Sequence, residues 1–213
     1  AAGGLGVVRR AEDRRLRRPV AVKELLTPSP AAERRFLREA AITARLQHPA
    51  IVPIYDIGRH PGGEPFYCMK LVEGQTLAAA IRGASGLLAR VGLLEHVIAA
   101  ADAIAYAHRH GVVHRDLKPA NILIGEVGET VVIDWGLAKD LDGELDDALE
   151  DTGAGTHPEL APLTQAGAVM GTLRYMPPEQ ALGGEVDPRS DVFSLGAVLF
   201  HVLAGEAPYA GAQ

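Results

Sequence analysis

The sequence has little of what disulfide-bonded, nucleic-acid-binding or membrane-spanning proteins need. Its 213 residues include one cysteine, Cys68, which cannot form an internal disulfide, so we expect a reducing, cytoplasmic setting. The formal net charge is −6, which argues against a general nucleic-acid binder. No apolar run approaches the ~20 residues of a transmembrane helix. The longest candidate, Val192 to Ala204, contains Ser194 and His201 and predicts a buried helix, so no membrane segment is expected in this chain.

Two further features are absent. The histidines, among them His48, His108, His110 and His201, show no paired metal-ligand spacing, which makes a zinc site improbable. The chain has no signal-peptide pattern and no initiating Met, and it starts inside 1–4 as though cut from a longer protein. We therefore expect a parent protein that could carry membrane anchors or sensor domains elsewhere.

A short hairpin carries the most informative polar groups. Two apolar runs, 122–124 and 131–133, are joined by the turn residues of 125–130, which predicts paired β-strands. Asn121 stands just before the first run and Asp134 just after the second. In an antiparallel pair these two side chains lie side by side at the open end of the hairpin. Two oxygen ligands at neighbouring strand ends suit Mg²⁺, which fills its shell with phosphates and water.

Asp116, in the loop that enters this hairpin, is left to face a reacting group, and the convergence indicates phosphoryl transfer. The alternative is structural, because an isolated Asp beside a strand end is usually a turn former or a helix cap. The spacing of Asp116, Lys118, Asn121 and Asp134 favours the chemical interpretation.

Upstream, a glycine-rich turn at 3–8 opens the chain, although such a turn is at least as often a plain hairpin. The run 19–23 predicts a strand in which Ala21 and Lys23 share a face. A Lys beside a small Ala leaves room for a flat ligand next to a positive charge.

A helix is expected at 31–47, because apolar residues recur there at helical spacing. The stripe consists of Phe36, Glu39, Ala40, Thr43 and Leu46. Glu39 is the acid on this packing face, and a buried carboxylate needs a partner. Lys23 is one candidate, and a neighbouring Arg on the same helix is the other.

Two more strands are expected at 51–58 and 65–72, a break at 73–74, and a main amphipathic helix at 92–110. Strands followed by helices indicate an α+β protein with segregated lobes. We place a β-rich lobe at 1–72.

The second, mainly helical lobe is expected at 73–213. Within it, 137–163 is acidic and poor in large apolar residues, so we expect a flexible loop there. The helix that begins at Ser190 is apolar almost all round, as a central core helix would be.

The motifs resemble those of protein kinases. Residues 114–121 (HRDLKPAN) match the catalytic loop H-R-D-x-x-x-x-N, and 134–136 (DWG) match D-F-G with Trp135 in place of Phe. From its first residue to its last, the chain resembles the catalytic domain of a eukaryotic-like (Hanks-type) bacterial serine/threonine protein kinase. That resemblance implies a two-lobed fold and transfer of the γ-phosphate of ATP to Ser/Thr hydroxyls of proteins, with Mg²⁺.

The resemblance also assigns a nucleotide site. The glycine-rich loop falls on Gly3, Gly6 and Val8, with Ala1 in place of its first glycine. Lys23 is expected to hold the α- and β-phosphates, with Glu39 as its partner. Around the adenine ring, the resemblance implies Met69 as the gatekeeper, hydrogen bonds from the backbone of Lys70 and Val72, and packing by Ala21, Val8 and Leu123.

By the same resemblance, Asp116 orients the substrate hydroxyl and takes its proton, and Lys118 neutralises the γ-phosphate. Asn121 and Asp134 are the expected Mg²⁺ ligands. The aromatic Trp135 is expected to pack beneath the helix that carries Glu39, and His114 to pack against Trp135.

Regulation by phosphorylation of the activation loop is suggested by Arg115, which can pair with an added charge. The candidate sites are Thr164 first, then Thr156 and Thr152, and the alternative is that these are ordinary loop threonines. The segment 171–172 resembles the substrate-positioning segment, and 177–179 replaces A-P-E.

Two other functions match parts of the sequence. A pseudokinase that binds nucleotide or partners is favoured slightly by Ala1 and Trp135, and opposed by the intact charged set. A small-molecule phosphotransferase is opposed by 171–172 and 178–179, which shape a peptide site in the kinases.

The expected partners are ATP and protein substrates, with possible self-association for autophosphorylation. The last helices of the helical lobe, with an arginine that would pair with Glu179, are expected to be missing. An uncovered apolar helix face would then make this segment alone poorly soluble or inactive.

Overall fold

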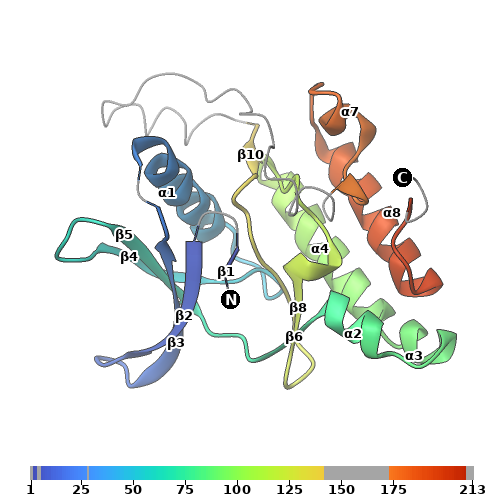
Figure 1. The fold of residues 1–213 in the computed structure, drawn as a ribbon, viewed down its shortest axis with the longest axis horizontal. Helices are drawn as coiled ribbons and strands as arrows, with labels where there is room; N and C mark the ends of the chain where they lie inside the picture. The colour runs from blue at the N-terminus through green and yellow to red at the C-terminus, as the bar shows by residue number, and fades with distance from the viewer. Residues whose placement is uncertain (1, 4–5, 28, 142–172, 210–213) are drawn as a thin grey trace.

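The computed structural model describes residues 2–3, 6–27, 29–141 and 173–209. A β-sheet with one long helix lies beside a mainly helical region, as Figure 1 shows. We call these the sheet lobe, which runs to Lys70, and the helical lobe, which starts at Gly74. The expected α+β fold with two lobes is confirmed.

The sheet lobe is built on one antiparallel sheet with the strand order β1-β2-β3-β5-β4. Its strands are β1 (Ala2–Gly3), β2 (Gly6–Asp13), β3 (Arg18–Leu25), β4 (Ile54–Arg59) and β5 (Pro65–Lys70). The β2–β3 turn is fixed by Asp13, whose Oδ1 accepts bonds from the N–H groups of Arg15 and Leu16, each 3.1 Å long. Because the register pairs Val8 with Lys23, the glycine-rich turn ends beside the lysine.

Helix α1 (Pro30–Arg45) covers this sheet. Ser29 caps it by accepting a 3.2 Å bond from the N–H of Ala32, and Pro30 occupies its first turn, where no donor is lost. Its buried residues are Ala32, Phe36, Glu39, Ala40, Ile42 and Thr43. The helix predicted at 31–47 is confirmed to within two residues, with Glu39 on its buried side.

The helical lobe contains two small sheets and several helices. The sheets have the orders β6-β8-β9 and β10-β7, from β6 (Gly74–Thr76), β7 (Val112–Val113), β8 (Ile122–Gly125), β9 (Thr130–Val132) and β10 (Lys139–Asp140). The helices are α2 (Leu77–Gly83), α3 (Leu87–Val91), α4 (Leu94–Arg109), the 3₁₀ turn η1 (Pro119–Asn121), α7 (Pro178–Ala181) and α8 (Pro188–Ala204). In the described ranges, no helix is long and apolar enough to cross a membrane.

The two hydrophobic cores do not divide at the expected residue 72. A small core of the sheet lobe includes Phe36 and Tyr67. The large core of the helical lobe takes in Ile42 of α1 and Leu46, the residue that follows this helix, together with Ile51. Ile51 makes a parallel bridge to Val132 of β9 instead of starting β4, so the strand predicted at 51–58 begins three residues late, at Ile54. The lobe boundary at 72 stays a prediction about the chain, but in packing α1 spans both cores.

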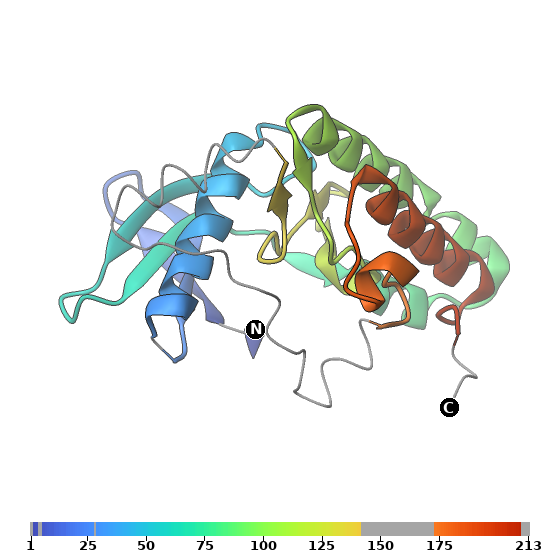
Figure 2. The same cartoon turned by 90° about the horizontal axis from the view of Figure 1, so that it is seen from above.

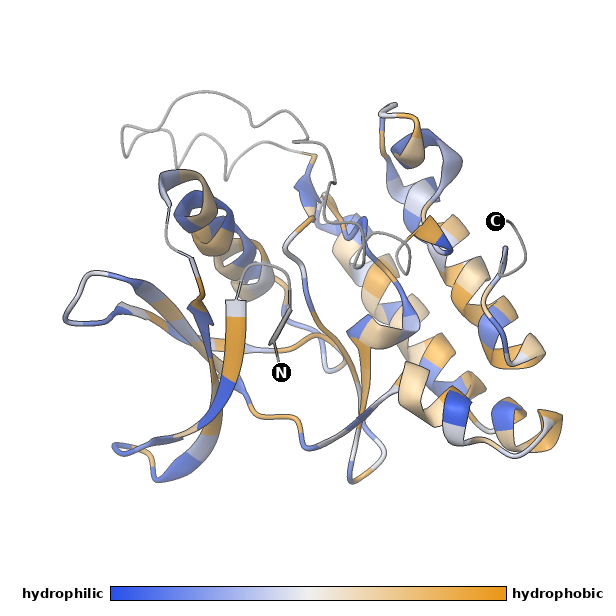
Figure 3. Cartoon of the chain, in the orientation of Figure 1, coloured by the Kyte–Doolittle hydropathy of each residue, from blue (hydrophilic) through white to orange (hydrophobic). Residues whose placement is uncertain are grey.

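Helix α8 departs from the expected central core helix. Val192, Phe200 and Leu203 are 61%, 48% and 40% exposed, so one apolar face is open among the described residues (Figure 3). The opposite face buries small and polar residues such as Ser190 and Asp191, which contact other loops. Composition alone could not separate the two faces, because apolar residues such as Val192 and Val198 occur on both.

The acidic segment expected to be flexible from residue 137 is ordered at its start. Residues 139–140 form β10, which pairs antiparallel with β7, and the N–H of Leu141 donates to the carbonyl of Gly111 over 2.7 Å. Asp140 is buried there, with its carboxylate 3.0 Å from Arg45. The prediction was wrong for 137–141 because these tertiary partners supply what the segment's own composition lacks, and 142–163 lies outside the described residues.

Candidate active site

The predicted hairpin is confirmed as β8 and β9. These strands pair antiparallel with Ile122 opposite Val132, and the N–H of Ile133 donates to the carbonyl of Asn121 over 2.9 Å. Asn121 and Asp134 therefore lie at the open end, as the pairing predicted. Asp134 takes a left-handed conformation, with φ of 66°, as it leaves the strand.

Asp116 lies at the centre of a polar cluster beside this open end. Lys118 places its Nζ 3.0 and 2.8 Å from the two carboxylate oxygens of Asp116. Asn121 donates from Nδ2 to the backbone carbonyl of Asp116 over 2.8 Å and to its Oδ2 over 3.1 Å. Burial raises the pKa of Asp116, the charge on Lys118 opposes that rise, and the like charge on Asp134 adds to it.

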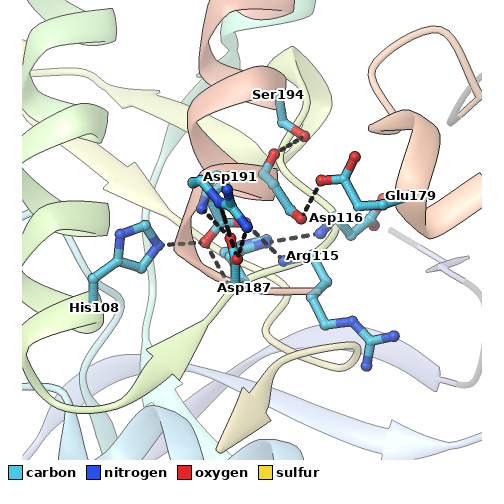
Figure 4. Close-up of polar contacts among 10 residues, drawn as sticks. His108, Arg115, Asp116, Glu179, Asp187, Asp191 and Ser194 are labelled. Carbon is cyan, nitrogen blue, oxygen red and sulfur yellow. Dashed lines mark hydrogen bonds and ion pairs between the residues drawn. The ribbon is translucent and has the colours of Figure 1, made fainter. Parts of the chain in front are cut away.

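The loop that carries Asp116 is held from below by Asp191 of α8. Its Oδ2 accepts bonds of 2.8 Å from the backbone N–H of His114 and from Nε2 of His108, and its Oδ1 accepts a 2.9 Å bond from the N–H of Arg115. Figure 4 shows His108 reaching Asp191 from α4. Although burial acts to raise the pKa of Asp191, these hydrogen bonds and the charge on His114 hold it below the ordinary value.

On the sheet-lobe side, Lys23 and Glu39 form a close ion pair. Nζ of Lys23 is 2.5 Å from Oε1 of Glu39, and the hydroxyl of Tyr67 donates to the same oxygen over 2.8 Å. A Cβ placed on Gly136 would be 3.2 Å from Oε2 of Glu39 and 3.4 Å from Oδ1 of Asp134. The glycine thus permits the two carboxylates to approach, and of the two partners considered for Glu39, the structure selects Lys23.

The protein kinase domain family matches residues 2–213. The chain belongs to the protein kinase family.

Its curated relatives are bacterial serine/threonine kinases. It is 43% identical to serine/threonine-protein kinase PknB of Mycolicibacterium smegmatis over 98% of this chain and 32% of that protein. It is 39% identical to serine/threonine-protein kinase PknD of Protochlamydia amoebophila, over 97% of this chain and 22% of the relative. It is also 41% identical to the DNA damage-responsive serine/threonine-protein kinase RqkA of Deinococcus radiodurans, over 98% and 29%. The chain therefore spans about a third or less of the length of these relatives.

The sheet-lobe residues expected to hold nucleotide lie on four of its strands, β1, β2, β3 and β5. Gly3 pairs with Gly6, and a Cβ on Gly6 would be only 2.7 Å from the carbonyl of Glu24, so a larger residue would collide with the strand. Ala21 is opposite Met69 in the register and is buried, whereas Met69 is half-buried. These positions are compatible with the roles expected of them.

The connection between the lobes carries the residues expected to bind adenine. The N–H of Lys70 donates to the carbonyl of Pro53 over 3.1 Å, so that group is already engaged. Lys70 also reaches Glu129 with its side chain, at 3.5 Å. Val72 and Leu123 are both half-buried. The sequence-based adenine assignment to Lys70, Val72 and Leu123 stays a prediction.

The expected Mg²⁺ ligands present a suitable donor set. Asn121 uses its Nδ2 group to hold Asp116, which leaves its Oδ1 as the atom suited to a cation, and Asp134 is exposed beside it. Two hard oxygens at one point fit an ion that takes its remaining ligands from phosphate and water. The described residues contain no cluster of three or more His, Cys, Asp or Glu that could hold a metal ion.

The expected regulatory residues are only partly described. Arg115 has a left-handed backbone, with φ of 68°, and its pKa is lowered by burial and by the nearby charge of Arg38, while Asp191 opposes this. Glu179 accepts a 2.6 Å bond from the hydroxyl of Ser190. The candidate phosphosites Thr152, Thr156 and Thr164 and the segment 171–172 lie outside the described residues.

Sequence reasoning gave no roles to Tyr67, His108 and Asp191. Tyr67 is paired with Lys23 in the β3–β5 register, and this strand alignment is the only signal that could have pointed to it. Trp135 and His114 behave as expected: Trp135 is buried in the large core with Ile42 of α1, and its ring lies 4.6 Å from that of His114.

Proposed function

We propose that this chain is the catalytic part of a serine/threonine protein kinase that transfers the γ-phosphate of ATP to Ser/Thr hydroxyls of proteins. The observation that carries the proposal is the buried Asp116, held by Lys118 and Asn121 at the open end of the hairpin, with the Lys23–Glu39 pair on the facing lobe. Family membership supports the class of reaction.

In this proposal the oxygen of the substrate hydroxyl attacks the γ-phosphorus, the bond from that phosphorus to the β,γ-bridging oxygen breaks, and ADP leaves with the bonding electrons. Asp116 accepts the proton of the hydroxyl, so the proton ends on a carboxylate oxygen of Asp116. Lys118, which already contacts both of those oxygens, lies close enough to the same point to neutralise the transferring phosphoryl group. Lys23, oriented by Glu39, holds the α- and β-phosphates. Catalysis then consists mainly of positioning and charge stabilisation.

Asn121 and Asp134 would hold Mg²⁺ through their side-chain oxygens. When bound, the ion would supply positive charge to the phosphates. No observation on the described residues favours the pseudokinase alternative. The Lys23–Glu39 pair together with Asp116 and Lys118 opposes it, because a partner-binding module has no need of this set.

Transfer of labelled phosphate from ATP to a generic protein substrate tests the proposal, using the full-length protein with and without Asp134→Ala. We expect transfer by the parent and a loss of at least about 100-fold in the variant, because a ligand of the essential ion is removed. Equal transfer by both proteins would contradict the role of Asp134, and no transfer by the parent would contradict the proposed function.

A further inference from the structure

Helix α1 is tied to the helical lobe by a pair of arginines on one side of the helix. Arg38 and Arg45 are seven residues apart, which is two helical turns, so they project in nearly the same direction. Nη1 of Arg38 donates to the carbonyl of Ala138 over 2.7 Å. Nη1 of Arg45 lies 3.0 Å from Oδ2 of Asp140. Both contacts reach the short segment that follows Asp134.

The Asp140 side of this contact is fully buried. The side chain of Asp140 is 0% exposed, whereas that of Arg45 is 35% exposed. A carboxylate removed from water in this way is stabilised by a nearby cation, because burying a charge is unfavourable. Moving α1 outward would draw Arg45 away and remove this stabilising contact from Asp140.

The location of Asp140 connects α1 to the catalytic loop. Asp140 lies opposite Val112 in the β10–β7 pair, and Lys139 lies opposite Val113. The residue after β7 is His114, two positions before Asp116. Figures 1 and 2 both place β10 between α1 and α4. Arg45 therefore contacts β10, and β10 pairs with β7, the strand that leads into the loop carrying Asp116.

The same helix carries Glu39 toward Lys23. One turn of α1 thus faces β3 through Glu39, while Arg38 and Arg45 face the segment 138–140. Helix α1 thus contacts both β3, which carries Lys23, and the segment that follows Asp134.

We propose that Arg45 and Asp140 are positioning residues, which hold α1 at the angle where the Lys23–Glu39 pair faces Asp134. The Arg38 contact to the Ala138 carbonyl assists them. This inference rests on the proposed function, since it concerns the productive arrangement of the same site. Neither residue touches nucleotide or substrate in this scheme.

The test uses the full-length protein with Asp140→Asn, Arg45→Gln and the double variant. The matched control is Glu33→Gln, which breaks an ion pair from the same helix to Arg59 that stays within the sheet lobe. For each protein, kcat, KM for ATP, the melting temperature and the amide hydrogen exchange of residues 36–45 are measured.

We expect each single variant to raise KM for ATP and to lower kcat/KM about 10-fold, because small displacements of a site are costly. The double variant should lose no more than the worse single one, as coupled partners do. Exchange in 36–45 should rise in all three and stay unchanged in the Glu33→Gln control, whose kinetics should lie within about 2-fold of the parent. Arg45→Lys should recover most of the loss seen in Arg45→Gln.

Unchanged exchange in 36–45 together with unchanged KM would overturn the proposal. So would a lower melting temperature with unchanged kinetics, because that pattern belongs to an ordinary structural ion pair. Amide hydrogen exchange of residues 36–45 tests the positioning role without an assay of phosphate transfer. Absence of transfer by the parent protein would instead contradict the proposed function.

Discussion

Two buried aspartates belong to the same loop region: Asp116 is part of the loop, and Asp191 of α8 binds the backbone of that loop. Their pKa values are shifted in opposite directions. Burial acts to raise the pKa of both. Asp191 accepts three hydrogen bonds, two of them from backbone N–H groups, and its pKa falls below the ordinary value. Asp116 accepts bonds from Lys118 and Asn121 but faces the like charge of Asp134, and its pKa rises.

The difference separates a carboxylate that holds the loop from the carboxylate proposed to accept a proton. Asp191 remains charged and thereby fixes the backbone of the loop, because fixed donors favour the ionised form. Asp116 is poised closer to protonation, which suits a group that must take up a proton and release it again. Two buried carboxylates thus have opposite pKa shifts, which depend on the donors and charges around each one.

The largest effect is expected from Asp191→Ala. This change leaves the N–H groups of His114 and Arg115 without their partner inside the protein. We expect a loss of about 3–5 kcal/mol in the free energy of unfolding, and with it the loss of phosphate transfer. Denaturant unfolding followed by fluorescence of Trp135 measures it. A loss below about 1 kcal/mol would mean that the loop does not depend on Asp191.

Asp116→Asn should give the opposite pattern. The substitution removes a carboxylate whose ionised form is disfavoured by burial, so stability should be unchanged or slightly higher. Phosphate transfer should fall by about 10²–10⁴-fold, while the affinity for ATP stays within about 2-fold. Parallel unfolding, kinetic and nucleotide-binding measurements decide it, and an equal loss of ATP affinity would contradict the assigned role.

The pH dependence sharpens the contrast. The raised pKa of Asp116 means that transfer should decline on acidification with a midpoint above 3.8, the ordinary value for Asp. Lys118→Ala should move this midpoint to higher pH in its residual activity, because Lys118 lowers the pKa of Asp116. Asp191, with its depressed pKa, contributes stability above pH 3.8 that is lost only as the pH falls through its lower folded value.

These two pH effects are measured separately, as a rate profile and as the acid limb of unfolding. Asp116 would not control the rate if transfer declined only over the pH range in which the protein unfolds. The same conclusion would follow if Lys118→Ala left the midpoint of the rate profile at the same pH.

The smallest effect is expected from His108→Gln. This variant removes one of the three donors to Asp191 but keeps both backbone bonds. We expect a loss of about 1–2 kcal/mol in the free energy of unfolding and little change in KM for ATP. His110→Gln is the control, because His110 lies at the exposed end of α4 and bonds only locally, to the carbonyl of Tyr106. Equal losses in both variants would indicate general damage to α4.

The residues predicted from sequence are those with a local signature. Asn121, Asp134 and their hairpin follow from two apolar runs and a turn, and Glu39 follows from an acid on an apolar helix stripe. Asp191 had no such signature, because its partners, His108 and His114, are 83 and 77 residues away in sequence. Only the folded structure brings them together.

The same limit applies to Asp140. The acidic residues around it in sequence predict a flexible loop, whereas the structure pairs it with Arg45, 95 residues earlier. The sequence predicts a strand at Tyr67, but the bond from its hydroxyl to Glu39 depends on the separation of β5 and α1. Composition describes a segment by itself, and these residues are defined by their partners.

Helix α1 packs into both cores, and this has a consequence for how the molecule opens. Phe36 in its first half belongs with Tyr67 to the core of the sheet lobe. Ile42 in its second half belongs to the core of the helical lobe, which also contains Val132. The cooperative unfolding units therefore do not coincide with the lobes. If the sheet lobe opened without global unfolding, α1 would unfold from its N-terminal end, and its last turns would stay packed on the helical lobe. Refolding of the sheet could then start from these folded turns.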